Sequence, residues 1–179
     1  MSLILGIDPG LAHTGWGVID AREGRYRLVA HGVITTEPHD TPGARLSHLY
    51  DEVESLLSRY DPPEAGVENL YFAKNATSAI PVAQARGVVL LALERHGVHA
   101  DEYTPQVIKQ AIVGQGRAEK TQVQELLRML LGLHEVPAPD HAADALAAAI
   151  CHLHHLGFAA RAAAREDGPA GRSSPQKRE

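Results

Sequence analysis

The chain has 179 residues, enough for one domain and a short tail. Its single cysteine, Cys151, excludes an intrachain disulfide and fits a reducing compartment. The N-terminus lacks the basic start and long apolar run of a signal peptide, and no stretch of about 18 residues is apolar without a charge. We therefore exclude secreted, disulfide-framed and membrane-spanning classes, and we predict a cytoplasmic protein with no membrane partner.

Charge is unevenly distributed along the chain. The 17 basic and 22 acidic residues give a formal net charge of −5. Residues 161–179 carry five bases and three acids but little apolar content, which predicts a disordered basic tail after a domain at 1–160. The domain is therefore acidic, which taken alone argues against a nucleic-acid partner.

Hydrophobic periodicity and turn residues predict the following elements. In chain order they are strands at 3–8, 15–20 and 25–36, a helix capped by Thr41 that ends before Asp61, a strand at 65–69, a loop at 71–79, a helix at 80–97, a strand at 98–103, and helices at 105–113, 118–131 and 140–160. Closely linked strands followed by strand–helix–strand crossovers indicate an α/β fold. We predict a mixed five-stranded sheet, with an antiparallel meander plus parallel strands and helices on both faces.

Acidic residues stand at the ends of two of these elements and at the start of a third. Asp8 and Glu68 each end a short buried strand, where a carboxylate is costly unless it is paired, hydrogen-bonded or bound to a metal. His141 and Asp144 are three residues apart, so they share one face of the last helix. If these side chains meet at one sheet edge, they would repel each other unless divalent cations lie between them. A pair of metals about 3.5–4 Å apart would suit such a cluster and could cut a phosphodiester.

Each of these residues also has an ordinary alternative role. Asp8 could cap the turn that follows it, and Glu68 could pair with Lys74 or Arg86. His141 and Asp144 could be first-turn residues that the helix dipole favours.

Five motifs occur in a consistent order, with AKN counted as part of the second. They are GIDPG (6–10) followed by Thr14-Gly15, VEN (67–69) with two aromatics, AKN (73–75), QARGV (84–88), VGQGRAEKTQVQ (113–124) and DHAADALAAAI (140–150). From about residue 3 to 157 the chain closely resembles the RuvC family of Holliday-junction resolvases. The resemblance implies an RNase H-like fold and a homodimer. It also implies metal-dependent, symmetric nicking of two opposed strands of a four-way DNA junction in recombination and repair, leaving 5′-phosphate and 3′-hydroxyl ends. RuvA and RuvB, the branch-migration proteins, are the implied partners.

The resemblance also implies roles for single residues. By motif position, Asp8, Glu68 and Asp144 are metal-binding carboxylates, and Lys109 and Lys120 meet DNA near the scissile phosphate. In chain order, the expected DNA contacts are Tyr71, Phe72, Lys74, Asn75, Arg86, Lys109, Arg117 and Lys120. Without the resemblance, each lysine would be interpreted as a solvated helix charge.

One position departs from the family pattern, which commonly has Asp where this chain has His141. Asp140 comes one residue too early and would point about 100° away on a helix. We predict that His141 is the fourth metal ligand and that Asp140 caps the helix. We expect two ions, Mg²⁺ or Mn²⁺, in each site. Because imidazole is a softer ligand than carboxylate, Mn²⁺ is the expected preference.

The distribution of bases answers the objection from net charge. Residues 69–90 and 103–118 contain bases and no acid, and both stretches adjoin the predicted site. Local patches of charge, more than the net charge, decide where DNA docks.

Two further features have competing interpretations. The helix at 80–97 is apolar around much of its circumference, so it could bury one side against a second copy or lie wholly inside the monomer. His152, His154 and His155 look like a metal-binding tract. No acid stands beside them in the sequence, so we interpret them as partly exposed helix residues.

Three other functions fit the sequence less well. An ATPase of the actin and sugar-kinase class shares a similar first loop but needs two such domains. A related RNA-processing nuclease lacks the QARGV and AEKTQVQ motifs. A catalytically inactive junction binder would not need all four ligands.

Overall fold

A mixed sheet of five strands forms the middle layer of the computed structural model, which describes residues 3–22, 25–69 and 76–166. The strands are β1 (Leu3–Asp8), β2 (His13–Arg22), β3 (Arg25–Thr35), β4 (Glu64–Glu68) and β5 (His99–Tyr103). They lie in the order β3-β2-β1-β4-β5. The pairs β1–β2 and β2–β3 are antiparallel, whereas β1–β4 and β4–β5 are parallel. The predicted meander plus parallel strands is confirmed.

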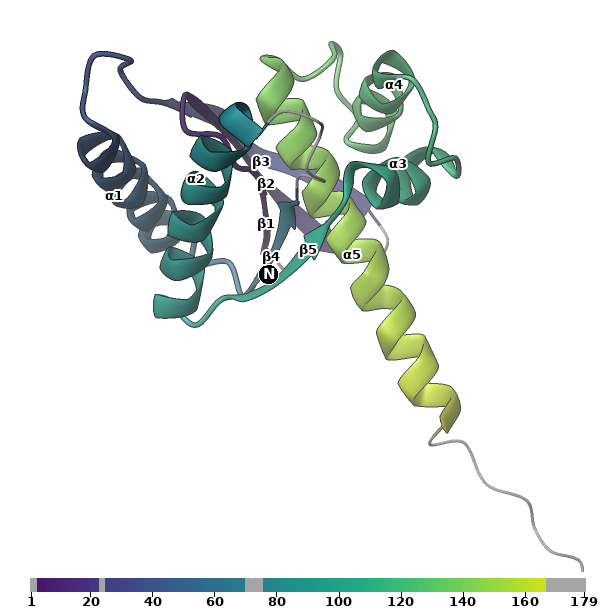
Figure 1. The fold of residues 1–179 in the computed structure, drawn as a ribbon. Coiled ribbons are helices and arrows are strands. Elements are labelled where there is room, and N and C mark those ends of the chain that lie inside the picture. The colour runs from purple at the N-terminus through teal and green to yellow at the C-terminus, as the bar shows by residue number, and fades with distance from the viewer. Residues whose placement is uncertain (1–2, 23–24, 70–75, 167–179) are drawn as a thin grey trace, which may run out of the picture.

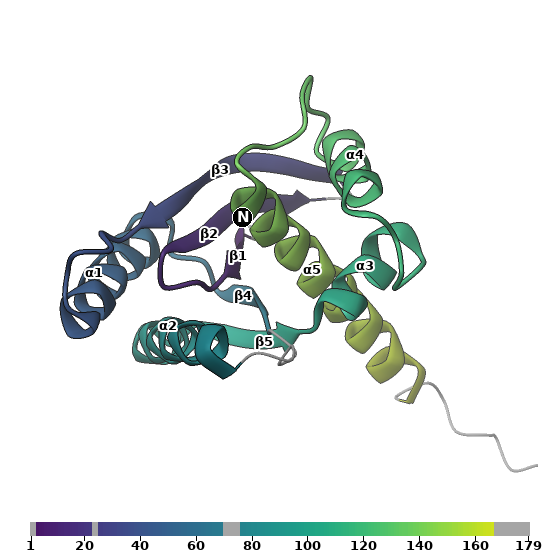
Figure 2. The ribbon, with the colours of Figure 1, turned by 45° about the horizontal axis from the view of Figure 1, so that its top comes forward.

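Helices cover both faces of the sheet, as predicted (Figures 1 and 2). One face is covered by α1 (Pro42–Tyr60) and α2 (Ala76–Arg95), and the other by α3 (Pro105–Val113), α4 (Lys120–Leu130) and α5 (Asp140–Glu166). Each face has its own buried apolar cluster. Among the helices that the structure describes, none is both long enough and apolar enough to cross a membrane.

Several element ends follow local sequence signals. Thr41 caps α1 by accepting a hydrogen bond from the backbone N–H of Ala44, and Pro42 occupies the first turn. Gly114 ends α3 with a φ of 80°, a left-handed conformation that glycine adopts without strain. The segment Gly114-Gln115-Gly116 is therefore a turn after a helix.

Five helix boundaries differ from those that the sequence predicts, of which the end of α4 at Leu130 differs by a single residue. Helix α2 begins at Ala76, inside the predicted loop. Pro81 therefore lies within the helix and does not mark its first turn. It ends at Arg95. Helix α4 begins at Lys120, since Glu119 and Gln122 form a reciprocal capping box there. Helix α5 continues to Glu166, six residues beyond its predicted end.

Helix α5 lies unusually close to the sheet because small residues face each other across the contact. A Cβ atom on Gly6 of β1 would overlap the carbonyl oxygen of Ala145, and one on Gly66 of β4 would lie 2.5 Å from the carbonyl oxygen of Ala148. The side chains along this face of α5 are mostly buried alanines. This contact holds the N-terminal turns of α5 at the end of the sheet where β1 and β4 finish.

Candidate active site

Two strand ends bring two carboxylates to one edge of the sheet. Asp8 is the last residue of β1 and Glu68 the last residue of β4. Because β1 and β4 are parallel neighbours, their carboxyl ends share an edge. Strand ends are rigid supports, which hold ligands more precisely than loops do.

The first turns of α5 complete the group. Gly15 of β2 pairs with Asp8, and a Cβ on Gly15 would overlap the carbonyl oxygen of His141. The first turn of α5 therefore lies directly over the end of β1. His141 Nδ1 donates to Asp8 Oδ2 at 2.8 Å. One ligand atom from each of Asp8, His141 and Asp144 lies within 4.8 Å of the others, so one cation could bind all three.

Glu68 faces the same group across a small cavity. The cavity, about 190 Å³, is lined by Glu68, Pro105, Ile108, Lys109, Lys120, Val123, Asp144 and Ala147. Burial, together with the negative charges of Asp8 and Asp144, raises the pKa of Glu68 to about 8. Burial also raises the pKa of Asp8. The carboxylates are thus held together against their mutual repulsion, which a divalent cation would relieve.

Lys120 supplies positive charge beside these acids. Its Nζ donates to Asp144 Oδ2 at 2.9 Å and lies 3.4 Å from Asp140 Oδ2. Burial lowers the pKa of Lys120, but the hydrogen bond and negative charge of Asp144, together with Asp140, outweigh burial and raise it. Lys120 is an exposed ammonium ion, as the solvated-lysine alternative expects, and it also pairs with a predicted metal ligand.

Two interpretations of neighbouring residues need correction. Asp140 does not cap α5 but is its first helical residue, because the carbonyl of Pro139 accepts the first helical hydrogen bonds. Arg86 pairs with Glu102 and not with Glu68. This ion pair occupies a guanidinium that we expected to meet DNA.

The other expected DNA contacts fall in different places. Lys109 lines the cavity with Glu68, whereas Arg117 lines a separate cavity between α3 and α5. The remaining contacts, Tyr71, Phe72, Lys74 and Asn75, lie outside the described residues.

Sequence reasoning missed two residues near the site. Thr14 Oγ1 donates to the carbonyl of Gly10 at 2.7 Å and so closes the turn that follows Asp8. The ring of His13 lies 5.7 Å from that of His141. Thr14 belongs to the first motif, so its presence there was the available signal. Nothing in the sequence alone pairs His13 with His141.

The prediction for the histidine tract was wrong for His152. This side chain is fully buried, and its Nε2 lies 3.0 Å from Glu64 Oε2. The acid that accompanies it comes from β4, almost ninety residues away, which sequence spacing could not reveal.

Comparison with known proteins places this fold and site in a family. The family model described as "Crossover junction endodeoxyribonuclease RuvC" matches residues 4–152. The chain belongs to the RuvC family. The RuvC of Treponema denticola is 55% identical over 151 residues, which cover 84% of this chain and 85% of that protein.

Solved RuvC structures agree with this membership. A Thermus thermophilus RuvC structure is 35% identical, covers 88% of this chain and 96% of its own, and superimposes with a TM-score of 0.82. A second structure, T. thermophilus RuvC in complex with Holliday junction substrate, is 33% identical with a TM-score of 0.81, covering 87% of this chain and 96% of its own. The RNase H-like fold and the nuclease class that the motifs imply are confirmed.

Proposed function

We propose that this RuvC-family chain is a metal-dependent endonuclease that resolves four-way DNA junctions. One observation carries the proposal: Asp8, His141 and Asp144 present ligand atoms within 4.8 Å of one another. Glu68 faces them across the cavity. The T. thermophilus RuvC solved with Holliday junction substrate supports the choice of DNA.

The four side chains match the needs of phosphodiester hydrolysis. Asp8, Glu68, His141 and Asp144 would hold two divalent cations. Bound at such a site, divalent cations polarise the phosphate and lower the pKa of water. The donor set fits them, since three carboxylates carry more negative charge than Lys120 alone can balance.

Two lysines lie where the reacting phosphate would bind. Lys109 and Lys120 line the cavity beside Glu68 and Asp144, where their ammonium groups would stabilise negative charge at the reacting phosphorus. Cleavage would leave 5′-phosphate and 3′-hydroxyl ends. Arg117 and the segment 71–75 would contact the junction further out, and Arg86 would do so only if DNA displaced Glu102.

The active unit would be a homodimer that pairs through α2. Ile80 and Leu91 are 61% and 53% exposed, and they lie eleven residues apart, which places them on one helix face. Gly87 lies between them, and a Cβ there would meet no atom within 4 Å. Among the residues that the structure describes, none accounts for a helix-interior glycine there, whereas a second helix packed closely on this face would.

A two-fold dimer matches the two-fold symmetry of a junction that is nicked on two opposed strands. The family resemblance extends the proposal to recombination and repair, with RuvA and RuvB as partners.

The decisive experiment compares a synthetic four-way junction with a linear duplex, with and without Mn²⁺ or Mg²⁺. We expect metal-dependent cutting of the junction only. Asp8→Asn should slow cutting by more than about 100-fold, because losing a residue that merely orients a metal ligand already costs about 10- to 100-fold. Junction binding by this variant, measured by gel shift in Ca²⁺, should stay near the unmodified level.

Two results would refute the proposal. One is near-normal cutting by Asp8→Asn, and the other is equal cutting of linear duplex. Asp51→Asn, on the exposed face of α1, is the matched control and should cut normally.

A further inference from the structure

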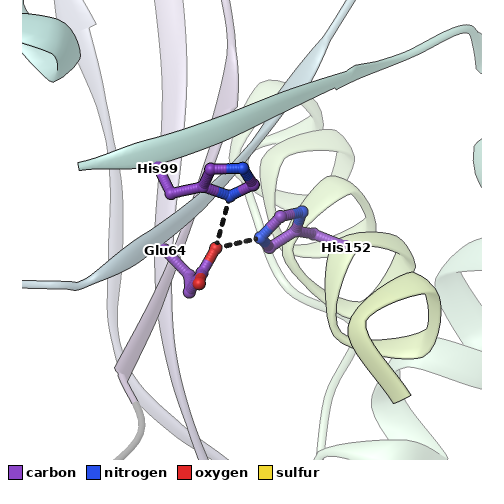
Figure 3. A group of neighbouring side chains, drawn as sticks. All are labelled: Glu64, His99 and His152. Atoms are coloured by element: carbon purple, nitrogen blue, oxygen red, sulfur yellow. Dashed lines mark hydrogen bonds and ion pairs between the residues drawn. The ribbon is translucent and has the colours of Figure 1, made fainter. Parts of the chain in front are cut away.

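A second group of metal-ligating side chains lies at the other end of the parallel strands. Glu64 begins β4 and His99 begins β5, and the two residues are paired in register. Their side chains therefore lie side by side on one face of the sheet. Helix α5 crosses that face and brings His152 to the same point (Figure 3).

The three ligand atoms converge on a single carboxylate oxygen. His99 Nδ1 lies 2.9 Å and His152 Nε2 lies 3.0 Å from Glu64 Oε2 (Figure 3). One ligand atom from each of the three residues lies within 4.8 Å of the others. In the absence of a cation, protons on the imidazoles bridge these atoms.

Packing fixes the position of the buried ligand. Gly66 follows Glu64 on the same face of β4, and a Cβ there would lie 2.8 Å from the Cβ of His152. The glycine thus lets α5 approach closely enough for His152 to reach Glu64. His152 is fully buried, whereas the His99 side chain is 64% exposed. One ligand is therefore fixed by packing, and a cation could reach the group from solvent on the His99 side.

His152 also has the outer support that metal-binding histidines usually have. Its Nδ1 lies 2.9 Å from Tyr103 Oη, and Tyr103 Oη donates to Asp101 Oδ2 at 3.5 Å. When Nδ1–H donates to the tyrosine, Nε2 keeps its lone pair free for a metal. Such a partner holds the imidazole in one tautomer and orientation.

We propose that Glu64, His99 and His152 bind one divalent transition-metal cation, with Zn²⁺ as the best match. Two imidazoles and one carboxylate, with the fourth position open to water, form a common Zn²⁺ ligand set. Mg²⁺ is a poor match because it prefers oxygen ligands in octahedral geometry. Glu64 and Glu68 are the first and last residues of β4, so this site is roughly 13 Å from the nuclease site. It would join β4, β5 and α5 and is independent of the proposed function.

The test uses tag-free Asp8→Asn/Asp144→Asn protein, which lacks two active-site ligands but retains the second group. We expect Zn²⁺, titrated in competition with a chromophoric chelator, to bind with one equivalent. Co²⁺ should give the intense visible absorption of a four-coordinate site. Adding His99→Ala should weaken Zn²⁺ binding by more than about 100-fold and abolish the Co²⁺ band.

Two further variants separate this site from other surface ligands. Glu64→Gln should weaken Zn²⁺ binding in the same way as His99→Ala, because it removes the shared carboxylate. His96→Ala is the matched control, since His96 pairs with Glu54 at 2.7 Å and has no second imidazole. Zn²⁺ binding that survives both ligand variants, or that His96→Ala removes equally, would overturn the proposal.

Discussion

Glu68 shows at the scale of one residue how the active site is prepared for cations. Its side chain combines burial with two neighbouring carboxylates, which together raise its pKa to about 8. Burial also raises the pKa of Asp8, and the hydrogen bond from His141 offsets only part of this rise. In the metal-free site the Glu68 carboxyl group therefore keeps its proton, whereas in the metal-bound site it would be an ionised carboxylate.

We predict that metal-free protein holds this proton at neutral pH. Because the pKa of Glu68 is raised from 4.5 to about 8, the native state binds more protons than the unfolded state between these values. The free energy of unfolding should therefore fall as pH rises through this window, by at most about 1.4 kcal/mol per pH unit.

Cation binding should expel the proton, so Mg²⁺ affinity should rise with pH up to about 8. Calorimetric titrations in buffers of different ionisation enthalpy measure the protons released. Glu68→Gln should release fewer protons than the unmodified protein, and equal release would contradict the assignment.

The imidazole of His141 leads to a prediction about which metal supports the fastest cutting. An imidazole among carboxylates favours Mn²⁺ over Mg²⁺, so cutting should be faster in Mn²⁺ across a metal titration. His141→Asp, which restores the common family residue, should narrow the difference between the two metals. Equal or faster cutting by the unmodified protein in Mg²⁺ would count against His141 as a ligand.

At the scale of an element, α5 positions half of the active site by its closeness to the sheet. Its first turn lies over the end of β1 only because Gly15 has no side chain. A displacement of this helix would move His141 and Asp144 together, away from Asp8. The site therefore depends on glycines that perform no chemistry.

We predict that Gly15→Ala impairs both folding and cutting. Its Cβ would overlap the backbone of His141, so the free energy of unfolding should fall by about 3 kcal/mol, the upper end of the usual cost of overpacking. Metal affinity should fall as well. Gly43→Ala in α1 is the control, because no atom lies within 4 Å of its Cβ and it should leave stability equal or higher. Thermal denaturation measures the stability of both variants, and calorimetric titration of the folded proteins with Mn²⁺ measures their metal affinity. Similar stability and affinity of the two variants would contradict the prediction.

At the scale of the whole molecule, the exposed residues Ile80 and Leu91 of α2 would decide, through the proposed dimer, how many strands are cut in one encounter. A dimer on a two-fold junction can nick both strands before it dissociates, whereas a monomer nicks one at a time. The prediction that α2 has apolar residues to spare is confirmed by the exposure of Ile80 and Leu91, and the wholly buried alternative is wrong.

We predict that Leu91→Asp yields a monomer that still binds metal. Analytical ultracentrifugation should show half the mass, because a charge in the middle of an apolar contact must be desolvated. On a supercoiled plasmid with an extruded cruciform, the unmodified protein should give linear product and the variant mainly nicked circles. Val29→Asp, at a similarly apolar exposed position on β3, should leave the dimer intact. A dimeric Leu91→Asp would refute α2 as the interface.

The sequence by itself determined the order of elements and the mixed sheet, and the family resemblance predicted which three carboxylates form the metal site. These are readable because periodicity and turn residues act locally, and because Asp8 and Glu68 stand at strand ends. Helix boundaries such as Ala76 and Glu166 were less accessible, since long helices are set largely by packing.

Tertiary structure alone decided which charged groups meet. Arg86 lies with Glu102, and His152 lies with Glu64 and His99, because strand register and helix crossing bring together residues far apart in the chain. Spacing in sequence contains no information about such contacts, which depend on how closely α5 approaches the sheet. The physical reason is that burial and ion pairing depend on distances within the folded chain and not on separation along the sequence.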